Sequence, residues 1–459
     1  MAYQPPKPGE MMTPKTTPTI SDFDLFRMHF NQILNRKHEL ILLAKAIDWS
    51  VFDREFGPLY DATNGRPGLP TRLLVGLHFL KHTFNESDES VCAKWVENPY
   101  WQCFCGYEYF QHELPLHPTS LVKWRKRIGP ERMETLLKAI LDTGKREGEV
   151  KPSDLKRVIV DTTVQEKAVA YPTDAGLYRR MIETLNRAAR KEGIKVRQSY
   201  LRLTRFLQIE QHRMRRGGQI KKANRALRKM RKNLERLTRD LIRKGDPQDE
   251  ELREMLLRAA QLLTQQSRSK DKLYSVHAPE VECIGKGKAH KPYEFGVKTG
   301  LVTTHGNNWI VGVRTFPGNP YDGHTLKAAL DQVKRMTGVE PAHAYVDKGY
   351  RGHGYEGATQ VHVSGQRHGP ISRAERRRRR RRAAIEPIIG HTKHDHRMIR
   401  CFLKGAAGDA VNAILAGCGF NLSKLLRAFR GRFFVLVYRW LLGLKIDNSS
   451  QFPHAESLC

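Results

Sequence analysis

Two short apolar runs that each end in an aspartate are the clearest pattern in the chain. Asp161 follows Val-Ile-Val and Asp347 follows Ala-Tyr-Val. Runs of this length and composition predict buried strands, which we place at residues 157–162 and 342–346. Both aspartates would then lie at the carboxyl end of a strand, where open α/β sheets keep their sites.

The rest of the second half shows the same alternation of strand and helix patterns. Mostly alternating β-branched runs predict strands at residues 294–299, 309–314 and 359–363, and helical spacing predicts helices at 325–336 and around Glu386. His-Gly-Asn-Asn between the first two of these runs predicts a hairpin turn. The order predicts an α/β fold with a small mixed sheet flanked by helices.

The first 145 residues are patterned for helices instead. Leucines at helical spacing follow Pro70, Ser87 is placed to cap a second helix, and a third, basic helix runs from residue 118 to Gly129. Short helices with sharp turns and a basic last member are typical of a helix-turn-helix DNA reader. A small helical bundle has the same pattern, so both interpretations stay open.

A strongly basic helical stretch separates the first strand from the others. Between residues 179 and 244 there are 23 Lys or Arg and five Asp or Glu, and Gly217-Gly218 divides two runs with helical apolar spacing. We predict a helical hairpin with a basic outer face, because a merely solvated face would interleave both signs. The domains expected from these patterns are a disordered tail (1–20), a helical DNA-binding domain (21–145), a catalytic core (150–176 and 276–405), a basic hairpin insert (177–275) and C-terminal helices (406–459).

Charge narrows the class of partner. The 459 residues include 80 Lys or Arg against 48 Asp or Glu, a formal net charge of +32. Such an excess predicts a polyanionic partner, DNA or RNA rather than a membrane. Neither a membrane-spanning apolar run nor a secretory signal is expected. Seven scattered cysteines, with Cys103 and Cys105 close together, predict reduced thiols rather than disulfides or zinc ligands.

Three acids in a basic chain suggest metal-dependent chemistry on phosphodiesters. Asp161, Asp347 and Glu386 would hold two divalent ions, Mg²⁺ or Mn²⁺, for in-line phosphoryl transfer. Taken singly, an aspartate after an apolar run is more often a turn or a helix cap. Arg382 and Lys393 would share a helical stripe with Glu386, although Arg382 and Glu386 also suit a plain intrahelical ion pair and Pro387 interrupts the helix.

Other residues complete the candidate set. Asp322 is either a fourth acid near the site or a cap for the following helix. His391, His394, His396 and Asp395 suit phosphate or solvent contact better than zinc. The candidate DNA-binding residues are Lys123, Arg125, Lys126, Arg376, Arg377, Arg378, Arg379, Arg380, Arg382 and Lys393.

Together these blocks resemble a known family. Val160-Asp161-Thr162-Thr163, Asp347-Lys348-Gly349-Tyr350 and Arg382-x3-Glu386-x6-Lys393 are similar to the three catalytic blocks of bacterial insertion-sequence DDE transposases, of the group numbered five. Residues 98–102 and 287–296 resemble it too. Arg379 departs from the family pattern, which often has Tyr there.

The resemblance implies an RNase H-like core with Asp161, Asp347 and Glu386 as its catalytic triad. It implies a DNA transposase that binds terminal inverted repeats, frees 3′-hydroxyls and joins them to target DNA. A homodimer, associated with the nucleoid in the bacterial cytoplasm, is expected. The alternatives are a nuclease or integrase with the same core, or an inactive basic DNA-binding protein.

Overall fold

The computed structural model of the chain describes residues 28–60, 68–266, 268–285, 291–366 and 371–441. The tail predicted at residues 1–20, residues 287–290 of one family-like stretch and residues 442–459 of the predicted C-terminal helices lie outside the described residues.

A mixed sheet forms the centre of the second half. Its strands are β1 (Arg157–Lys167), β2 (Glu282–Gly285), β3 (Tyr293–Thr304), β4 (Ile310–Phe316), β5 (His343–Val346), β6 (Gln360–Val363) and β7 (Arg400–Cys401). β1 pairs with β3 antiparallel along one edge and with β5 parallel along the other, and β6 pairs with β5 in parallel. β2 and β4 both pair with β3. The mixed α/β sheet predicted from the sequence is therefore confirmed.

Three strands and one turn refine the sequence prediction. β1 extends five residues beyond the predicted end at 162, because its pairing with β3 continues to Glu166. The predicted hairpin joins β3 to β4, and Asn308 takes the positive φ of 57° that such a turn needs. β2 and β7 were missed, since four and two residues carry too little pattern.

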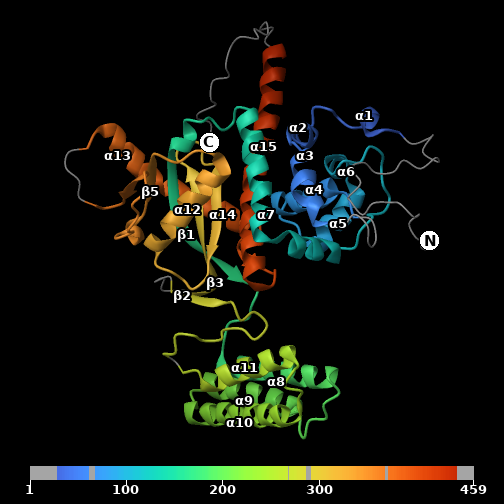
Figure 1. Cartoon of the computed structure of the whole chain (residues 1–459), viewed down its shortest axis with the longest axis vertical. Helices are drawn as coiled ribbons and strands as arrows, with labels where there is room; N and C mark the ends of the chain where they lie inside the picture. The colour runs from blue at the N-terminus through green and yellow to red at the C-terminus, as the bar shows by residue number, and fades with distance from the viewer. Residues whose placement is uncertain (1–27, 61–67, 267, 286–290, 367–370, 442–459) are drawn as a thin grey trace.

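The helices outside the insert surround this sheet and extend away from it. They are α1 (Phe30–Ile33), α2 (Glu39–Ala46), α3 (Ser50–Phe56), α4 (Thr71–Thr83), α5 (Asp88–Glu97), α6 (Pro99–Phe104), α7 (Thr119–Arg146), α12 (Asp322–Thr337), α13 (Arg373–Arg380), α14 (Ile385–His394) and α15 (Gly405–Leu441). Figure 1 shows α7 and α15 side by side between the sheet and the N-terminal helices. One hydrophobic core runs through all three layers, from Leu77 of α4 through Leu137 of α7 to Val160 of β1.

The third predicted helix, which is the first part of α7, ends at Gly129 as expected. A second helical part follows it and continues to Arg146. Gly129 has φ 73° and ψ 171°, which only glycine adopts readily, and this breaks α7 into two parts. Pro130 then opens the second part, where its missing N–H costs nothing. Ser87 caps α5 through the backbone N–H of Ser90, as predicted.

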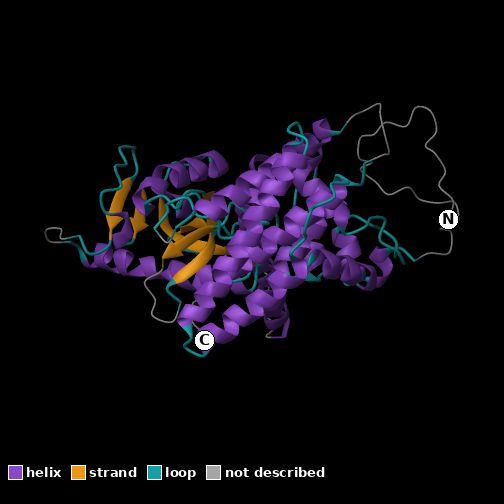
Figure 2. Ribbon diagram, turned by 90° about the horizontal axis from the view of Figure 1, so that it is seen from below, coloured by secondary structure: helices purple, strands orange, loops and turns teal. Residues whose placement is uncertain are grey.

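The insert has four helices, two more than the predicted hairpin. They are α8 (Asp174–Lys191), α9 (Leu201–Arg216), α10 (Ile220–Lys244) and α11 (Glu250–Thr264). Their buried faces form a second hydrophobic core, which includes Met181, Leu207, Met230 and Leu262. Figure 2 shows the strands gathered toward one side of the molecule, and Figure 1 places the insert beyond the lower end of the sheet (Figures 1 and 2). The domain boundaries themselves stay predictions.

Within the described ranges, no helix combines the length and the apolar composition that a membrane span requires.

Candidate active site

Asp161 and Asp347 meet where two parallel strands part. The β1–β5 register pairs Ile159 with Tyr345, so two residues further on Asp161 stands beside Asp347. Asp347 follows the last residue of β5, as predicted, but Asp161 lies inside β1 rather than at its end. The expectation for Asp161 is corrected in this respect: β5 stops after Val346, whereas β1 continues past Asp161 to Lys167.

Local hydrogen bonds hold both carboxylates. Asp161 Oδ1 accepts from the backbone N–H of Thr162 at 2.8 Å, and Asp347 Oδ1 accepts from the backbone N–H of Gly349 at 2.8 Å. The second contact caps the short 3₁₀ helix η4 (Lys348–Tyr350). In each aspartate a backbone N–H therefore holds Oδ1. This contact restricts the orientation of the carboxylate and so of its second oxygen, Oδ2.

The pair is electrostatically strained. Burial, and then the charge of Asp347, raises the pKa of Asp161 to about 6, although Arg382 acts in the opposite direction. A nearby carboxylate disfavours the charged form of Asp161, and a bound cation would relieve that repulsion. Hard oxygen ligands of this kind suit Mg²⁺ or Mn²⁺. The chemistry of the donor set therefore fits a divalent ion.

Among the contacts of the described residues, Glu386 is linked to this pair only through Arg382. Arg382 Nη1 lies 3.7 Å from Asp161 Oδ2, and Arg382 Nη2 lies 3.5 Å from Glu386 Oε1. The Glu386 side chain is 65% exposed, against 16% for Asp161. Among the described residues no group of three or more His, Cys, Asp and Glu side chains has the arrangement of a metal site. The guanidinium of Arg382 lies between Asp161 and Glu386, two of the acids that the sequence predicts as ligands of divalent ions.

The helix that carries Glu386 differs from the predicted stripe. Arg382 belongs to the 3₁₀ helix η5 (Arg381–Ala384), and α14 starts only at Ile385. Pro387 lies in the first turn of α14, so it removes no intrahelical hydrogen bond and produces no kink after Glu386. Lys393 lies in the last turn of the same helix and is half-buried.

Asp322, for which the sequence left two roles open, lies near Asp161. It is the first residue of α12, whereas the cap position belongs to Tyr321, so the predicted helix-cap role is not the one observed. Its carboxylate accepts hydrogen bonds from Thr162 and Lys298. Sequence reasoning missed Lys298, because a lone lysine in a strand gives no sign of a partner 24 residues later.

The predicted cluster of His391, His394, Asp395 and His396, at the end of α14 and just after it, does not converge. His391 Nδ1 lies 2.7 Å from Asp395 Oδ2 on the surface, while His396 is buried and contacts the backbone of His82. These side chains therefore point into different environments.

The arginine run has two kinds of member. Arg376, Arg377 and Arg380 are exposed on α13. Arg378 and Arg379 pair with Glu375, within 3.4 Å and 3.2 Å respectively. The exposed members, Arg376, Arg377 and Arg380, are the ones best placed to contact a phosphate backbone.

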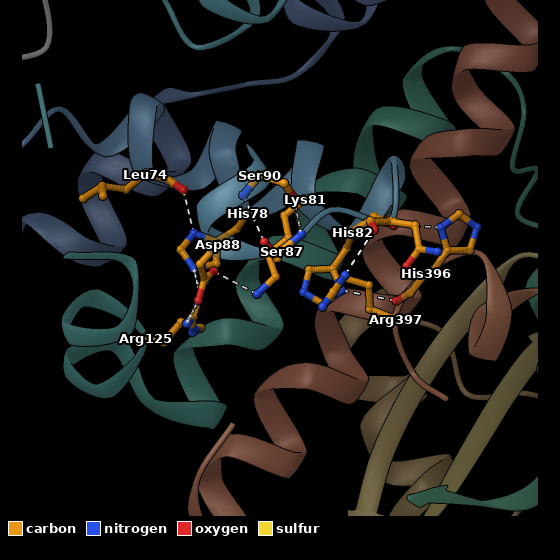
Figure 3. A network of polar contacts seen from close by, with 11 residues as sticks. Leu74, His78, Lys81, His82, Ser87, Asp88, Ser90, Arg125, His396 and Arg397 are labelled. Carbon is orange, nitrogen blue, oxygen red and sulfur yellow. Dashed lines mark hydrogen bonds and ion pairs between the residues drawn. The ribbon is translucent and has the colours of Figure 1, made fainter. Parts of the chain in front are cut away.

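In the N-terminal helices, the prediction that Arg125 binds DNA is corrected. Arg125 Nη2 lies 2.6 Å from Asp88 Oδ2, Lys81 Nζ lies 2.8 Å from Asp88 Oδ1, and the Arg125 side chain is 4% exposed (Figure 3). Burial alone would raise the pKa of Asp88, but the Arg125 hydrogen bonds and the Lys81 charge hold it well below its ordinary value. Arg125 therefore joins α5 to α7 and is not available to DNA. Lys123 and Lys126 are exposed on the same helix.

A second contact in Figure 3 connects these helices to the segment after α14. His396 Nδ1 donates to the backbone oxygen of His82 at 2.9 Å, and His82 Nδ1 donates to the backbone oxygen of His396 at 3.3 Å. Asn85 Nδ2 donates to the oxygen of His394, and Arg397 donates to the oxygen of Asn85. The N-terminal helices thus brace the end of the helix that carries Glu386.

Comparisons with known proteins identify the class to which this fold and site belong. Residues 260–422 match a family described as a transposase DDE domain, and residues 28–127 match one described as a transposase domain (DUF772). The chain therefore belongs to the DDE transposases, enzymes with an RNase H-like core that cut and join DNA and generally use divalent metal ions.

One relative is an uncharacterized protein, ORF8 in the nfe locus of Rhizobium meliloti. It is 48% identical over 196 residues, which cover 43% of this chain and 94% of that protein. No solved structure matches the chain.

Proposed function

We propose that this transposase moves an insertion element by binding its terminal inverted repeats, hydrolysing DNA to free 3′-hydroxyls and joining them to target DNA. The observation that carries the proposal is that Asp161 and Asp347 lie beside each other where β5 ends, with the pKa of Asp161 raised by burial and then by the charge of Asp347. Such a pair is unfavourable unless a cation joins it.

The acids and the basic residues of the site have different proposed roles. Asp161, Asp347 and Glu386 would hold two divalent ions, which supply an activated water or 3′-hydroxyl and stabilise the departing oxygen. Arg382, which lies between Asp161 and Glu386, would hold a phosphate near the scissile bond. Lys393 and the exposed arginines of α13 hold the neighbouring backbone.

DNA recognition is proposed for two other regions. Every Lys and Arg of α10 is exposed, which makes that helix an electrostatic surface for duplex DNA. On α7, Lys123 and Lys126 remain as candidates for contact with the inverted repeat. Two element ends must be brought together, so we propose that the active form is a homodimer.

The test is a plasmid assay with both element ends, purified protein and Mg²⁺. Asp161→Asn should reduce cleavage by about a thousandfold or more, because a metal ligand supplies several kcal/mol of transition-state stabilisation. DNA binding should remain, and Asp331→Asn, an exposed acid on α12, should cut at the wild-type rate.

Two outcomes would redirect the proposal. Cleavage by Asp161→Asn at the wild-type rate would remove Asp161 from the site. Cleavage without strand joining by the unmodified protein would favour a nuclease with the same core.

A further inference from the structure

A reciprocal pair of histidines joins the N-terminal helices to the end of α14. His82 lies in the last turn of α4, and His396 lies two residues beyond α14. The Nδ1 of His82 donates to the backbone oxygen of His396 at 3.3 Å, and the Nδ1 of His396 donates to that of His82 at 2.9 Å (Figure 3). Burial lowers the pKa of both rings, so both are neutral at pH 7. A neutral ring that donates from Nδ1 has one proton arrangement, so the contact has a single geometry.

The two chain segments that meet at this pair each contain a residue with a left-handed backbone. Asn85 has φ 61° and Arg397 has φ 66°. Asn85 Nδ2 donates to the backbone oxygen of His394 at 3.1 Å, and Arg397 Nη1 donates to the backbone oxygen of Asn85 at 3.1 Å. An arginine keeps this uncommon backbone only where its surroundings hold it, and such residues concentrate at functional sites. The contacts among His82, Asn85, His394, His396 and Arg397 are called the α4–α14 joint below.

The helix α15 holds the joint from a third side and connects it to the sheet. A Cβ added to Gly419 would lie 2.5 Å from the backbone oxygen of His82, so only glycine allows α15 to come this close. Asn412, on the same helix, donates from Nδ2 to the backbone oxygen of Arg397 at 3.1 Å and to Gln165 Oε1 at 3.0 Å. Gln165 belongs to β1, the strand that also carries the first acid of the site. One connected set of hydrogen bonds therefore includes the N-terminal helices, the end of α14 and β1.

The helix α14 connects the joint to the active site. Glu386 lies at the opposite end of this ten-residue helix, about 12 Å along the axis from His394. Ile385 and Ile388 pack α14 into the main core. Apolar contact is non-directional, whereas the hydrogen bonds of the joint specify where the end of the helix lies. A short helix moves as a unit, so a shift of its last turn also moves its first turn.

We propose that His82, Asn85 and His396 are positioning residues for DNA cleavage. They fix the end of α14 against the N-terminal helices and β1, and thereby set where Glu386 lies relative to Asp161. The N-terminal helices then contribute to the geometry of the active site, beyond any role in DNA recognition. The inference rests on the proposed function, because it assigns a role to residues that do not touch the reacting groups of that same site.

Asn85→Gly is the most selective test of the joint. Glycine accepts φ 61°, the position is exposed, and the backbone oxygen that Arg397 contacts remains, so the variant loses the side-chain contact with His394. On a plasmid with both element ends at saturating protein, cleavage should be about tenfold slower, because a small misplacement of a catalytic group lowers the rate by such factors. The dissociation constant for a duplex with one element end should be unchanged. Asn308→Gly, the same exchange at a left-handed position in the β3–β4 turn, should cut at the unmodified rate.

Two substitutions of His396 test the other half of the joint. His396→Ala removes the donor and should slow cleavage by about a hundredfold. His396→Asn places an amide N–H near the position of Nδ1 and should recover part of that rate. Amide hydrogen exchange of the free protein gives a readout that does not depend on activity: peptides from α14 should exchange faster in His396→Ala and Asn85→Gly, and peptides from α12 should not. Thermal unfolding shows whether each variant is folded at the assay temperature.

Three outcomes would overturn the inference and leave the proposed function standing. Variants that melt earlier but cleave at the unmodified rate while folded would show that the joint only stabilises the fold. Equal losses of DNA affinity and cleavage would assign the joint to DNA recognition. Unchanged hydrogen exchange in α14 would show that the joint does not hold that helix. Absence of cleavage by the unmodified protein would instead overturn the proposed function, and the positioning role with it.

Discussion

The N-terminal helices and the insert are both basic and helical, yet they use their arginines differently. In α7, Arg125 is buried and bonded to Asp88 of α5. In α10, every Lys and Arg is exposed, and the acids of that helix, Glu235 and Asp240, pair only with its own cations among the ion pairs described. The difference shows that basic composition alone does not identify a DNA-binding face.

The cause is what each region packs against. The N-terminal helices share one hydrophobic core with α15 and the sheet, so part of α7 faces protein on more than one side. The insert buries a single stripe against its own four helices and leaves the opposite stripe in solvent. An arginine on a helix that is covered on several sides needs an acid partner, because an unpaired buried charge is costly.

The largest effect should come from breaking the buried pair in the N-terminal region. Arg125→Met leaves Asp88 with Lys81 alone, and should lower the free energy of unfolding by about 3–5 kcal/mol. Lys126→Met, exposed on the next residue, should change it by less than about 0.5 kcal/mol. Urea unfolding measures both. Equal effects of the two substitutions would mean that Arg125 is a surface residue after all.

Removing the insert should affect DNA binding and spare the rest of the protein. Replacing residues 174–264 by a short Gly/Ser linker should weaken binding to a duplex by about a hundredfold at moderate salt, because many phosphate contacts are lost. The log–log salt slope should fall by about 0.9 for each contact removed. Thermal unfolding of the remaining chain should be unchanged, since the insert core is separate from the main core. An insoluble or unfolded product would show that the insert covers apolar surface of the catalytic core.

Acid should destabilise the N-terminal region through its buried histidines. Burial and the charge of Arg125 lower the pKa of His78 to about 3, and burial lowers the pKa of His82 well below its ordinary value. The unfolded chain takes up protons near pH 6.5 and the folded one does not, so stability is lost as pH falls from about 6.5 toward the folded pKa. At pH 5 the loss should be about 2 kcal/mol for His78.

Urea unfolding at pH 7 and pH 5 checks this sign and size. His78→Gln should make the pH dependence shallower, whereas His112→Gln, at an exposed position, should leave it as it is. An unchanged pH dependence in His78→Gln would contradict a neutral, buried His78.

The smallest effects should separate backbone grip from sequence discrimination. A triple variant in which Gln replaces Arg376, Arg377 and Arg380 should bind terminal-repeat and random duplexes more weakly and to the same extent. The loss of affinity should be a few-fold for each phosphate contact removed. Lys123 and Lys126 changed to Gln should instead reduce the preference for the terminal repeat. Competition binding on the two duplexes decides between them. Loss of the preference in the arginine variant alone would reverse the assignment.

The sequence by itself determined the local elements and the identity of the acids. Periodic apolar spacing and short β-branched runs depend only on near neighbours, so the strands before Asp161 and Asp347 and the helices α4, α5 and α12 were predictable. Ser87 could be read as a cap because its partner is three residues away. The family blocks added Glu386.

The tertiary structure alone decided which of these residues meet. Asp161 stands beside Asp347 because β1 pairs with a strand that comes 186 residues later, and Asp322 joins them through Lys298 and Thr162 on two different strands. Arg125 is buried because α5 places Asp88 opposite it. Each of these contacts depends on packing between segments far apart in the chain. Local periodicity depends only on near neighbours, so it does not predict such contacts.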